Sequence, residues 1–235
     1  ARIQRSLLPA KLPKIPTMQL AVYYETARRA GGDYYDLFEL PDGKWGLLIA
    51  DVSGHGTPAA VIMAVTHSIA HSFPNPPCCP SQMLNYVNER LCNAYTSDNS
   101  TFVTAFYGVY DPDSRQLSYA CAGHNPPRLK RCADGSVFSL DGVGGIPLGI
   151  DEGERYEPIT QTLQAGDQVI FYTDGITEAM NPAGQLFGLE RLDAAIEDCN
   201  LFASGLIKSV LDAVDEFSEG RPADDDRTIL TAKIS

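Results

Sequence analysis

The sequence predicts an α+β fold, a four-layer αββα sandwich in which two antiparallel sheets pack face to face and a helix pair covers each outer face. Two observations support this prediction. Strand-like segments group with strand-like segments and helical segments with helical ones, which is not the alternating order of a parallel α/β fold. The chain also has 235 residues, 44% of them hydrophobic, which is enough to bury one sizeable core.

The first block consists of three strand-like segments. Aromatic, β-branched and other apolar residues dominate residues 18–27, 33–40 and 44–52. Pro41 and Gly43 lie between the last two segments and favour a tight turn, because proline fixes φ and glycine accepts a positive φ. We therefore expect these two segments to pair as antiparallel strands.

Two helices are expected next, over residues 58–72 and 81–97. Pro58 suits the first turn of a helix, and Ser81 is a good N-cap residue. The proline-rich segment 74–80 separates the two helices, because proline cannot continue a helix. A helix pair after a block of strands predicts a helical layer on a sheet.

The remaining elements repeat this order. Six further strand-like segments are separated by turn sequences, and their sequences are TFVTAFYGVYD, RQLSYACAG, PRLKRC, SVFSL, RYEPITQTL and QVIFYTDG. Helices near 188–198 and 203–218 then precede a last strand, RTILTAKIS. We expect residues 18–235 to form one domain. Residues 1–17 are expected to be a linker, the tail of a helix from a sensor or receiver domain preceding residue 1.

Composition excludes several classes of protein. The net charge of −12 and pI near 4.6 argue against nucleic-acid binding, which needs clustered Lys and Arg. No run of 18 apolar residues occurs, so no membrane contact by this domain is expected. The six cysteines form no CxxC pair, and we expect them to be reduced thiols in a cytoplasmic protein.

Four aspartate-containing motifs carry the chemical signal: GGDYYD at 31–36, ADVSGHG at 50–56, YTDG at 172–175 and DDDRT at 224–228. Asp51 and Asp174 follow strongly apolar strands, so each is expected where a strand emerges at its end. Turn chemistry alone could explain any one of the motifs. Four together indicate a site for a hard divalent cation, because converging carboxylates otherwise repel one another.

The motifs resemble those of the PPM (PP2C-type) metal-dependent serine/threonine phosphatases, in the bacterial SpoIIE/RsbU-like branch. The resemblance spans essentially residues 4–235 and rests on motifs in the family's order: GGDYYD, ADVSGHG, AGHNPP, GIPLGI, YTDGITEA, FG and DDRT. It implies the same αββα fold that the element order predicts. It also implies two bound Mn²⁺ or Mg²⁺ ions.

The resemblance assigns ligand roles residue by residue. It makes Asp51 the bridge between the two ions and the carbonyl of Val52 a further ligand. Asp33, Asp174 and Asp225 correspond to the remaining acidic ligands. Such a pair of ions lowers the pKa of a shared water and offsets the charge of the phosphate, so we expect water to be the nucleophile.

Several neighbouring residues are secondary candidates. Asp36 is a candidate to hold a metal-bound water, and Asp226 to bind a third, weaker ion. His55 is a candidate to donate a proton to the leaving serine oxygen. Arg28 and Arg29 lie where eukaryotic members of the wider family carry a phosphate-binding arginine, although the sporulation-type branch usually lacks it.

The other histidines are interpreted as structural. His67 and His71 share a helix face at i, i+4, a spacing that could bind zinc, but the sequence shows no third ligand beside them. We therefore exclude them as ligands. His124 is in a family motif, where a loop-stabilising hydrogen bond is the simpler role.

The resulting hypothesis is a cytoplasmic phosphoserine/phosphothreonine phosphatase dependent on Mn²⁺ or Mg²⁺, the output domain of a bacterial signalling protein. The resemblance suggests a phosphorylated STAS-domain anti-anti-sigma factor as substrate and allows a homodimer. The alternative is a catalytically silent, phosphatase-shaped module that sequesters a partner, although such a decoy has no need of four clustered acids. A metal-dependent nuclease is disfavoured by the charge of −12.

Overall fold

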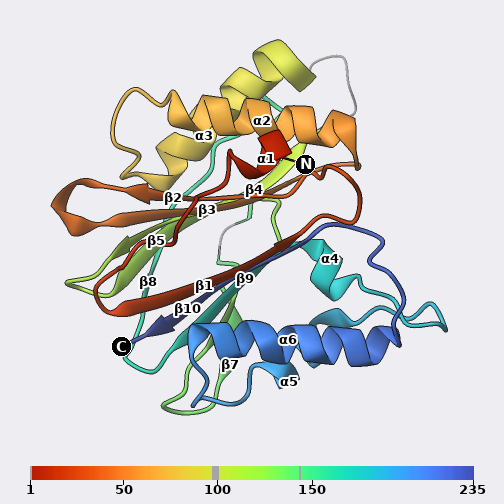
Figure 1. Ribbon diagram of the computed structural model, residues 1–235. Helices are drawn as coiled ribbons and strands as arrows, with labels where there is room; N and C mark the ends of the chain where they lie inside the picture. The colour runs from red at the N-terminus through yellow and green to blue at the C-terminus, as the bar shows by residue number, and fades with distance from the viewer. Residues whose placement is uncertain (1, 97–100, 143) are drawn as a thin grey trace.

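The computed structural model describes residues 2–96, 101–142 and 144–235, with two five-stranded antiparallel sheets packed face to face (Figure 1). The first sheet has the order β2 (Tyr34–Glu39), β3 (Trp45–Val52), β4 (Val103–Asp111), β5 (Gln116–Ala122), β8 (Ile159–Thr162). The second has the order β1 (Met18–Glu25), β10 (Arg227–Ile234), β9 (Gln168–Tyr172), β6 (Arg128–Lys130), β7 (Val137–Ser139).

Helices cover both outer faces, which confirms the predicted αββα sandwich. In Figure 1, α2 (Thr57–His71) and α3 (Pro80–Leu91) lie over the first sheet, and α5 (Gly188–Ala195) and α6 (Ala203–Ser218) lie over the second. The shorter elements are α1 (Arg2–Arg5), the 3₁₀ turn Pro41–Gly43, the π turn Cys92–Thr96 and α4 (Asp174–Thr177). No helix in the described ranges is long and apolar enough to cross a membrane.

The two faces of the first sheet pack in different hydrophobic cores. Successive residues of β3 alternate between these cores. Leu47 and Ile49 pack in the layer between the sheets, whereas Leu48 and Ala50 pack under α2 and α3. Successive strand residues point to opposite faces, so a strand covered on both sides is a continuous apolar run. The apolar sequence that predicted β3 is explained by this double burial.

The predicted strand pairing at the first turn is confirmed, and one helix start is corrected. β2 and β3 pair antiparallel across the Pro41–Gly43 turn. The second helix begins at Pro80, with Cys79 in the N-cap position, and not with Ser81 as N-cap. Proline at the first helical position needs no hydrogen-bond partner for its nitrogen, so Pro80 can start the helix one residue earlier.

The cysteines correct another expectation. Cys132, after β6, and Cys199, between α5 and α6, form a disulfide with a Cα–Cα distance of 5.7 Å, and the other four cysteines are free. The pair is 67 residues apart, and only the fold brings the two thiols together. The disulfide links the β6–β7 hairpin to the outer helical layer, so the expectation of six reduced thiols is wrong for this pair.

Candidate metal centre

Strand pairing brings the four acidic motifs to one end of the sandwich. Tyr34 pairs with Ala50, and the next residue out on each strand is an aspartate, so Asp33 and Asp51 lie opposite each other. Both continue the face of Ile49, which looks toward the second sheet.

The second sheet supplies the remaining acids at the same end. Asp174 is the first residue of α4, two residues beyond the end of β9. Asp225 lies two residues before β10, the antiparallel neighbour of β9. Asp51 interacts electrostatically with Asp33, Asp174 and Asp225. The residues assigned as ligands in the sequence therefore converge.

Asp33 is held by two threonines across the gap between the sheets. Its side chain is 1% exposed, and its Oδ2 accepts hydrogen bonds from Thr173 Oγ1 (2.7 Å) and Thr228 Oγ1 (2.6 Å). The two threonines are themselves linked, because the Thr228 N–H donates to Thr173 Oγ1 at 3.0 Å. The ends of β9 and β10 thus fix the orientation of a carboxylate that belongs to the first sheet.

Burial and mutual repulsion favour the protonated carboxyl groups when no cation is bound. Desolvation, opposed by the two threonine hydrogen bonds, raises the pKa of Asp33 to about 8. Desolvation and then the charge of Asp33 raise the pKa of Asp51 to about 10. For Asp174, desolvation and then Asp225 raise the pKa to about 6. Strongly raised carboxyl pKa values of this kind are typical of functional sites.

The donor groups fit hard divalent cations. No Lys, Arg or His among the described residues forms an ion pair with Asp33, Asp51, Asp174 or Asp225. A Cβ on Gly32 would lie 2.8 Å from the Val52 carbonyl oxygen and 3.2 Å from Asp51 Oδ1, so a side chain there would crowd both oxygens. Carboxylates and a carbonyl without a neighbouring cation form the oxygen-only set that Mg²⁺ and Mn²⁺ prefer.

Asp226 anchors the loop between β1 and β2. Its Oδ1 accepts from the Ala27 N–H (2.9 Å) and its Oδ2 from the Gly32 N–H (2.7 Å). Each carboxylate oxygen therefore holds one backbone N–H of the loop, which makes Asp226 a positioning residue, and its role as a ligand for a third, weaker ion stays a prediction. The loop that it holds carries Arg28 and Arg29, which are both exposed.

Asp36 does not join this group. It lies three residues after Asp33 and so faces the opposite side of the first sheet, where its Oδ2 is 2.6 Å from His71 Nε2 on α2. The suggestion that Asp36 holds a metal-bound water at the aspartate site needs correction, because strand alternation directs its side chain away from the other acids.

The histidines of the two glycine-rich motifs differ in position. His55 is exposed in the loop before α2, beside Pro58 and Ile62 in an open groove. His124 is 5% exposed and its Nδ1 is 2.9 Å from Thr104 Oγ1. Desolvation lowers the pKa of His124 to about 4, so its imidazole is neutral where it contacts Thr104, the strand partner of Asp51.

The residues that position the acids were not predicted from the sequence. Thr173 and Thr228 each lie within an aspartate motif, and this was the available signal. Gly31 was also missed as a close-contact position, since a Cβ there would lie 1.9 Å from Asp226 Oδ2.

Gln4 was not singled out either. Its side chain bonds both backbone groups of Gly31, with Nε2 donating to the carbonyl (2.6 Å) and Oε1 accepting from the N–H (3.2 Å).

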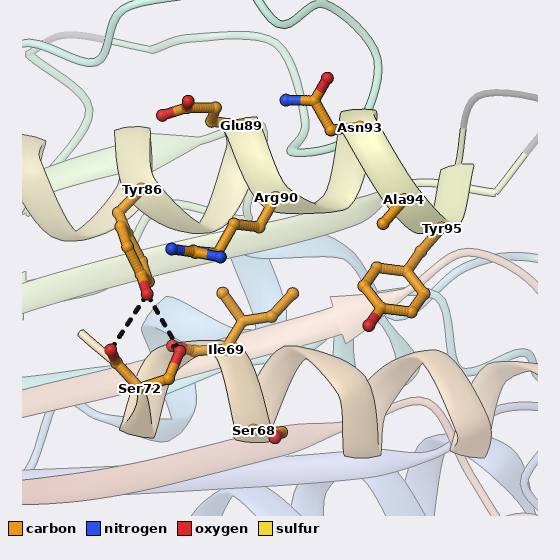
Figure 2. Close-up of a pocket in the computed structure, with 9 residues that line it drawn as sticks. All are labelled: Ser68, Ile69, Ser72, Tyr86, Glu89, Arg90, Asn93, Ala94 and Tyr95. Carbon is orange, nitrogen blue, oxygen red and sulfur yellow. Dashed lines mark hydrogen bonds between the residues drawn. The ribbon is translucent and has the colours of Figure 1, made fainter. Parts of the chain in front are cut away.

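A separate pocket of about 410 Å³ lies between α2 and α3 (Figure 2). Tyr86 crosses it, and its hydroxyl donates to the Ser72 carbonyl at 3.0 Å. The Arg90 guanidinium lies over the Tyr86 ring at 4.3 Å from its centroid. The only carboxylate lining this pocket is Glu89, so the pocket does not include the converging aspartates of the candidate metal centre.

Comparison with known structures identifies the class of domain. The SiaA PP2C domain of Pseudomonas aeruginosa superposes with a TM-score of 0.81, and the match covers 100% of this chain and 94% of that one. The two sequences are 22% identical, so this similarity shows the fold alone. The RsbU and RsbW domains of a Mycobacterium tuberculosis protein match with a TM-score of 0.76 at 28% identity, over 94% of this chain and 61% of that one. The fold is that of PP2C-type domains.

The sequence comparison gives the family. The family model described as "Stage II sporulation protein E (SpoIIE)" matches residues 41–235, and the chain belongs to this family. It is 30% identical over 225 residues to the phosphoserine phosphatase RsbU of Bacillus subtilis, which covers 96% of this chain and 66% of that protein. The chain thus spans slightly less than two thirds of this relative.

Proposed function

We propose that the chain is a metal-dependent protein phosphatase that hydrolyses phosphoserine or phosphothreonine with a water nucleophile at the four-aspartate centre. The single observation that carries the proposal is the convergence of Asp33, Asp51 and Asp174 without a cationic partner among the described residues. The similarity to RsbU, a phosphoserine phosphatase, supports the same reaction class.

In this proposal Asp51 would bridge two Mn²⁺ or Mg²⁺ ions, and Asp33, Asp174, Asp225 and the Val52 carbonyl would complete their protein ligands. When bound, the two ions would lower the pKa of a shared water and neutralise phosphate charge. Thr173 and Thr228 would keep Asp33 pointing at the centre. Asp226 would act on the site only through the backbone that it holds.

The exposed side chains near the centre would bind the phosphate of the substrate and protonate its leaving group. His55 lies on the loop that follows Asp51 and is open to solvent, so it is placed to protonate a leaving serine oxygen. Arg28 and Arg29 lie on the loop fixed by Asp226 and could bind phosphate oxygens through charge-assisted hydrogen bonds. Replacing each of these three residues by alanine separates their roles, since loss of the proton donor lowers kcat and loss of a phosphate contact raises KM.

The proposed substrate is a phosphorylated protein, a STAS-domain anti-anti-sigma factor, and the proposed place of the reaction is the cytoplasm. The name of RsbU supports phosphoserine as the group that is hydrolysed, and the STAS-domain protein is inferred from the family relationship alone. The Cys132–Cys199 disulfide is the observation against a reducing compartment. Labelling of free thiols in protein taken from cells without added reductant would decide this point. Six reactive thiols would support the cytoplasm and four would oppose it.

We further propose that residues 1–17 form a regulatory linker that reports the state of a preceding domain. Gln4 supports this because it bonds both backbone groups of Gly31, two residues before Asp33. A shift of the linker would therefore disturb the loop that presents Asp33. Gln4→Ala should weaken Mn²⁺ affinity while leaving the fold intact. Unchanged affinity and activity in this variant would contradict the linker role.

The rival proposal, a silent module that sequesters a partner, predicts no turnover. The test is phosphate release from an aryl phosphate and from a phosphoserine peptide, with Mn²⁺ or with EDTA, for the unmodified chain and for Asp51→Asn. Activity that requires Mn²⁺ and disappears in Asp51→Asn supports the phosphatase. Activity that persists in EDTA would contradict the metal mechanism, and no activity on any phosphoprotein would favour the silent module.

A further inference from the structure

Three metal-binding side chains meet on the other face of the first sheet, away from the four-aspartate centre. His67 and His71 lie one turn apart on α2 with ring centroids 4.3 Å apart, and Asp36 reaches them from β2. One donor atom from each of the three lies within 4.8 Å of the others. Within the described ranges, these three side chains place their donor atoms close enough together to share one ion.

Among the described residues, the carboxylate of Asp36 pairs with histidines only and not with a permanently charged side chain. Its residue exposure is 5%, and its ion-pair partners among the described residues are His67 and His71, with no Lys or Arg. The Leu37 N–H donates to its Oδ1 at 2.8 Å. A buried carboxylate needs hydrogen bonds and an opposite charge to offset its lost hydration. The hydrogen bonds are present, and a bound cation would supply the charge.

We infer that Asp36, His67 and His71 form a second metal site, between β2 and α2, for a borderline transition-metal ion of the Zn²⁺ type. Two imidazoles and one carboxylate are a donor set that suits zinc, cobalt and nickel better than magnesium. The His71 side chain is 47% exposed, so solvent reaches the edge of the cluster. A water would take the fourth position, as in other three-ligand zinc sites.

The donor distances need only small side-chain adjustments to accept the ion. Tetrahedral bonds of about 2.0–2.1 Å place neighbouring donor atoms about 3.3 Å apart. His71 Nε2 is 2.6 Å and His67 Nδ1 is 3.7 Å from Asp36 Oδ2. These two separations lie on either side of the required value, so an ion would push the first pair of atoms apart by about 0.7 Å and draw the second pair together by about 0.4 Å.

Tyr34 contacts two of the three side chains of the cluster, Asp36 and His67. Its hydroxyl donates to Asp36 Oδ2 at 2.5 Å and is 3.0 Å from His67 Nδ1. The Tyr34 ring is 1% exposed and meets the His67 ring edge-on, with centroids 5.6 Å apart. A buried hydroxyl bonded to a ligating carboxylate is the kind of outer partner that orients metal ligands. Tyr34 is therefore a positioning residue for the second site.

An ion at this site would tie α2 to β2. The helix begins at Thr57, six residues after Asp51, and His71 is its last residue. A 15-residue helix is about 22 Å long, so the second site would hold the far end of the helix that leads away from the aspartate centre. The site does not use any of the proposed phosphatase ligands, and its existence is independent of phosphatase activity.

The test is a titration of the full chain with Zn²⁺, and with Co²⁺ as a spectroscopic probe, in excess Mg²⁺. An Asp51→Asn background keeps the probe metals away from the aspartate centre. We expect one ion per chain and the visible absorption of tetrahedral Co²⁺. His71→Gln keeps a hydrogen-bond donor for Asp36 but removes the imidazole, and should weaken binding by about 100-fold. His55→Gln is the matched control and should bind as the background does.

Two results would overturn the inference. Equal zinc affinity in the background protein and in His71→Gln would mean that the cluster is a hydrogen-bond network only. Zinc binding that is lost when Cys78 and Cys79 are replaced by serine, but kept in His71→Gln, would assign the ion to the free thiols instead. Thermal unfolding without metal verifies that each variant is folded before its affinity is compared.

Discussion

The four-aspartate centre and the Asp36–His67–His71 cluster share one strand but face opposite layers of the sandwich. Asp33 looks toward the second sheet, among other carboxylates, and Asp36 looks toward α2, between two imidazoles. A three-residue step along a strand reverses the face. The six-residue GGDYYD motif therefore supplies one acid to each of two chemically different sites.

The donor atoms of the two sites determine which ions each can bind. The aspartate centre offers oxygen donors only and gathers negative charge, which suits Mg²⁺ or Mn²⁺. The second cluster combines one carboxylate with two nitrogen donors, which suits Zn²⁺. Substitutions at one site should therefore leave metal binding at the other unchanged.

The largest expected effect is that of Asp51→Asn on phosphate release. Removing the bridging carboxylate should lower Mn²⁺-dependent turnover about a thousandfold, because paired ions contribute several kcal/mol of transition-state charge stabilisation. Zinc affinity at the second cluster should not change. Steady-state release of phosphate, measured beside zinc titration, checks both statements, and loss of both properties would mean that the sites are not separate.

Asp33→Asn and Asp36→Asn form a matched pair on the same strand. The first should reduce Mn²⁺-dependent activity about a hundredfold, because it removes a charged ligand from ions that contribute several kcal/mol of transition-state stabilisation. The second should keep most of that activity and lose tight zinc binding. Comparable loss of activity in both variants at saturating Mn²⁺ would contradict the division of the motif between two sites.

Thr228→Val should have a smaller effect. It removes one of the two hydroxyl groups that donate to Asp33 Oδ2 and leaves a side chain of similar shape. An outer partner of this kind is worth about tenfold in metal affinity, so the Mn²⁺ concentration for half-maximal activity should rise while saturated turnover changes little. An unchanged Mn²⁺ requirement would show that Asp33 needs no such support.

The smallest expected effect is on the pH dependence of stability without metal. The folded-state pKa values are raised to about 8 for Asp33 and about 6 for Asp174. The protonated carboxyls therefore stabilise the fold most fully below about pH 4, and this contribution is lost as the pH rises through about 6 and then 8. In EDTA the melting temperature should fall between pH 5.5 and 8.5.

Asp51→Asn is the control for this pH effect. Its metal-free melting temperature should be higher than that of the unmodified chain at pH 8 and should fall less steeply, because Asp51, whose folded-state pKa is about 10, must take up a proton on folding at that pH and asparagine need not. Added Mn²⁺ should reverse the trend only in the unmodified chain, since its ligands must be deprotonated to bind. If the melting temperatures of the two proteins fall in parallel as the pH rises, the overall charge of the chain causes the fall and the aspartate centre does not.

Much of the fold and of the aspartate centre could be predicted from the sequence. Continuous apolar runs and the Pro41–Gly43 turn identified β2 and β3, and the motif order matched a known family. The disulfide and the second cluster could not be predicted. Cys132 and Cys199 meet only after the strands and helices pack. His67 and His71 have the right spacing, but their third partner lies on another element, 31 residues before His67 in the sequence.

The count of Mn²⁺ ions bound per chain tests the central claim most directly. Equilibrium dialysis in the His71→Gln background excludes the second cluster from the count. The four-aspartate centre predicts two ions per chain, and Asp51→Asn should bind neither at concentrations that saturate the unmodified centre, because Asp51 is the proposed bridge. One ion per chain, or two ions retained in Asp51→Asn, would contradict the two-metal centre.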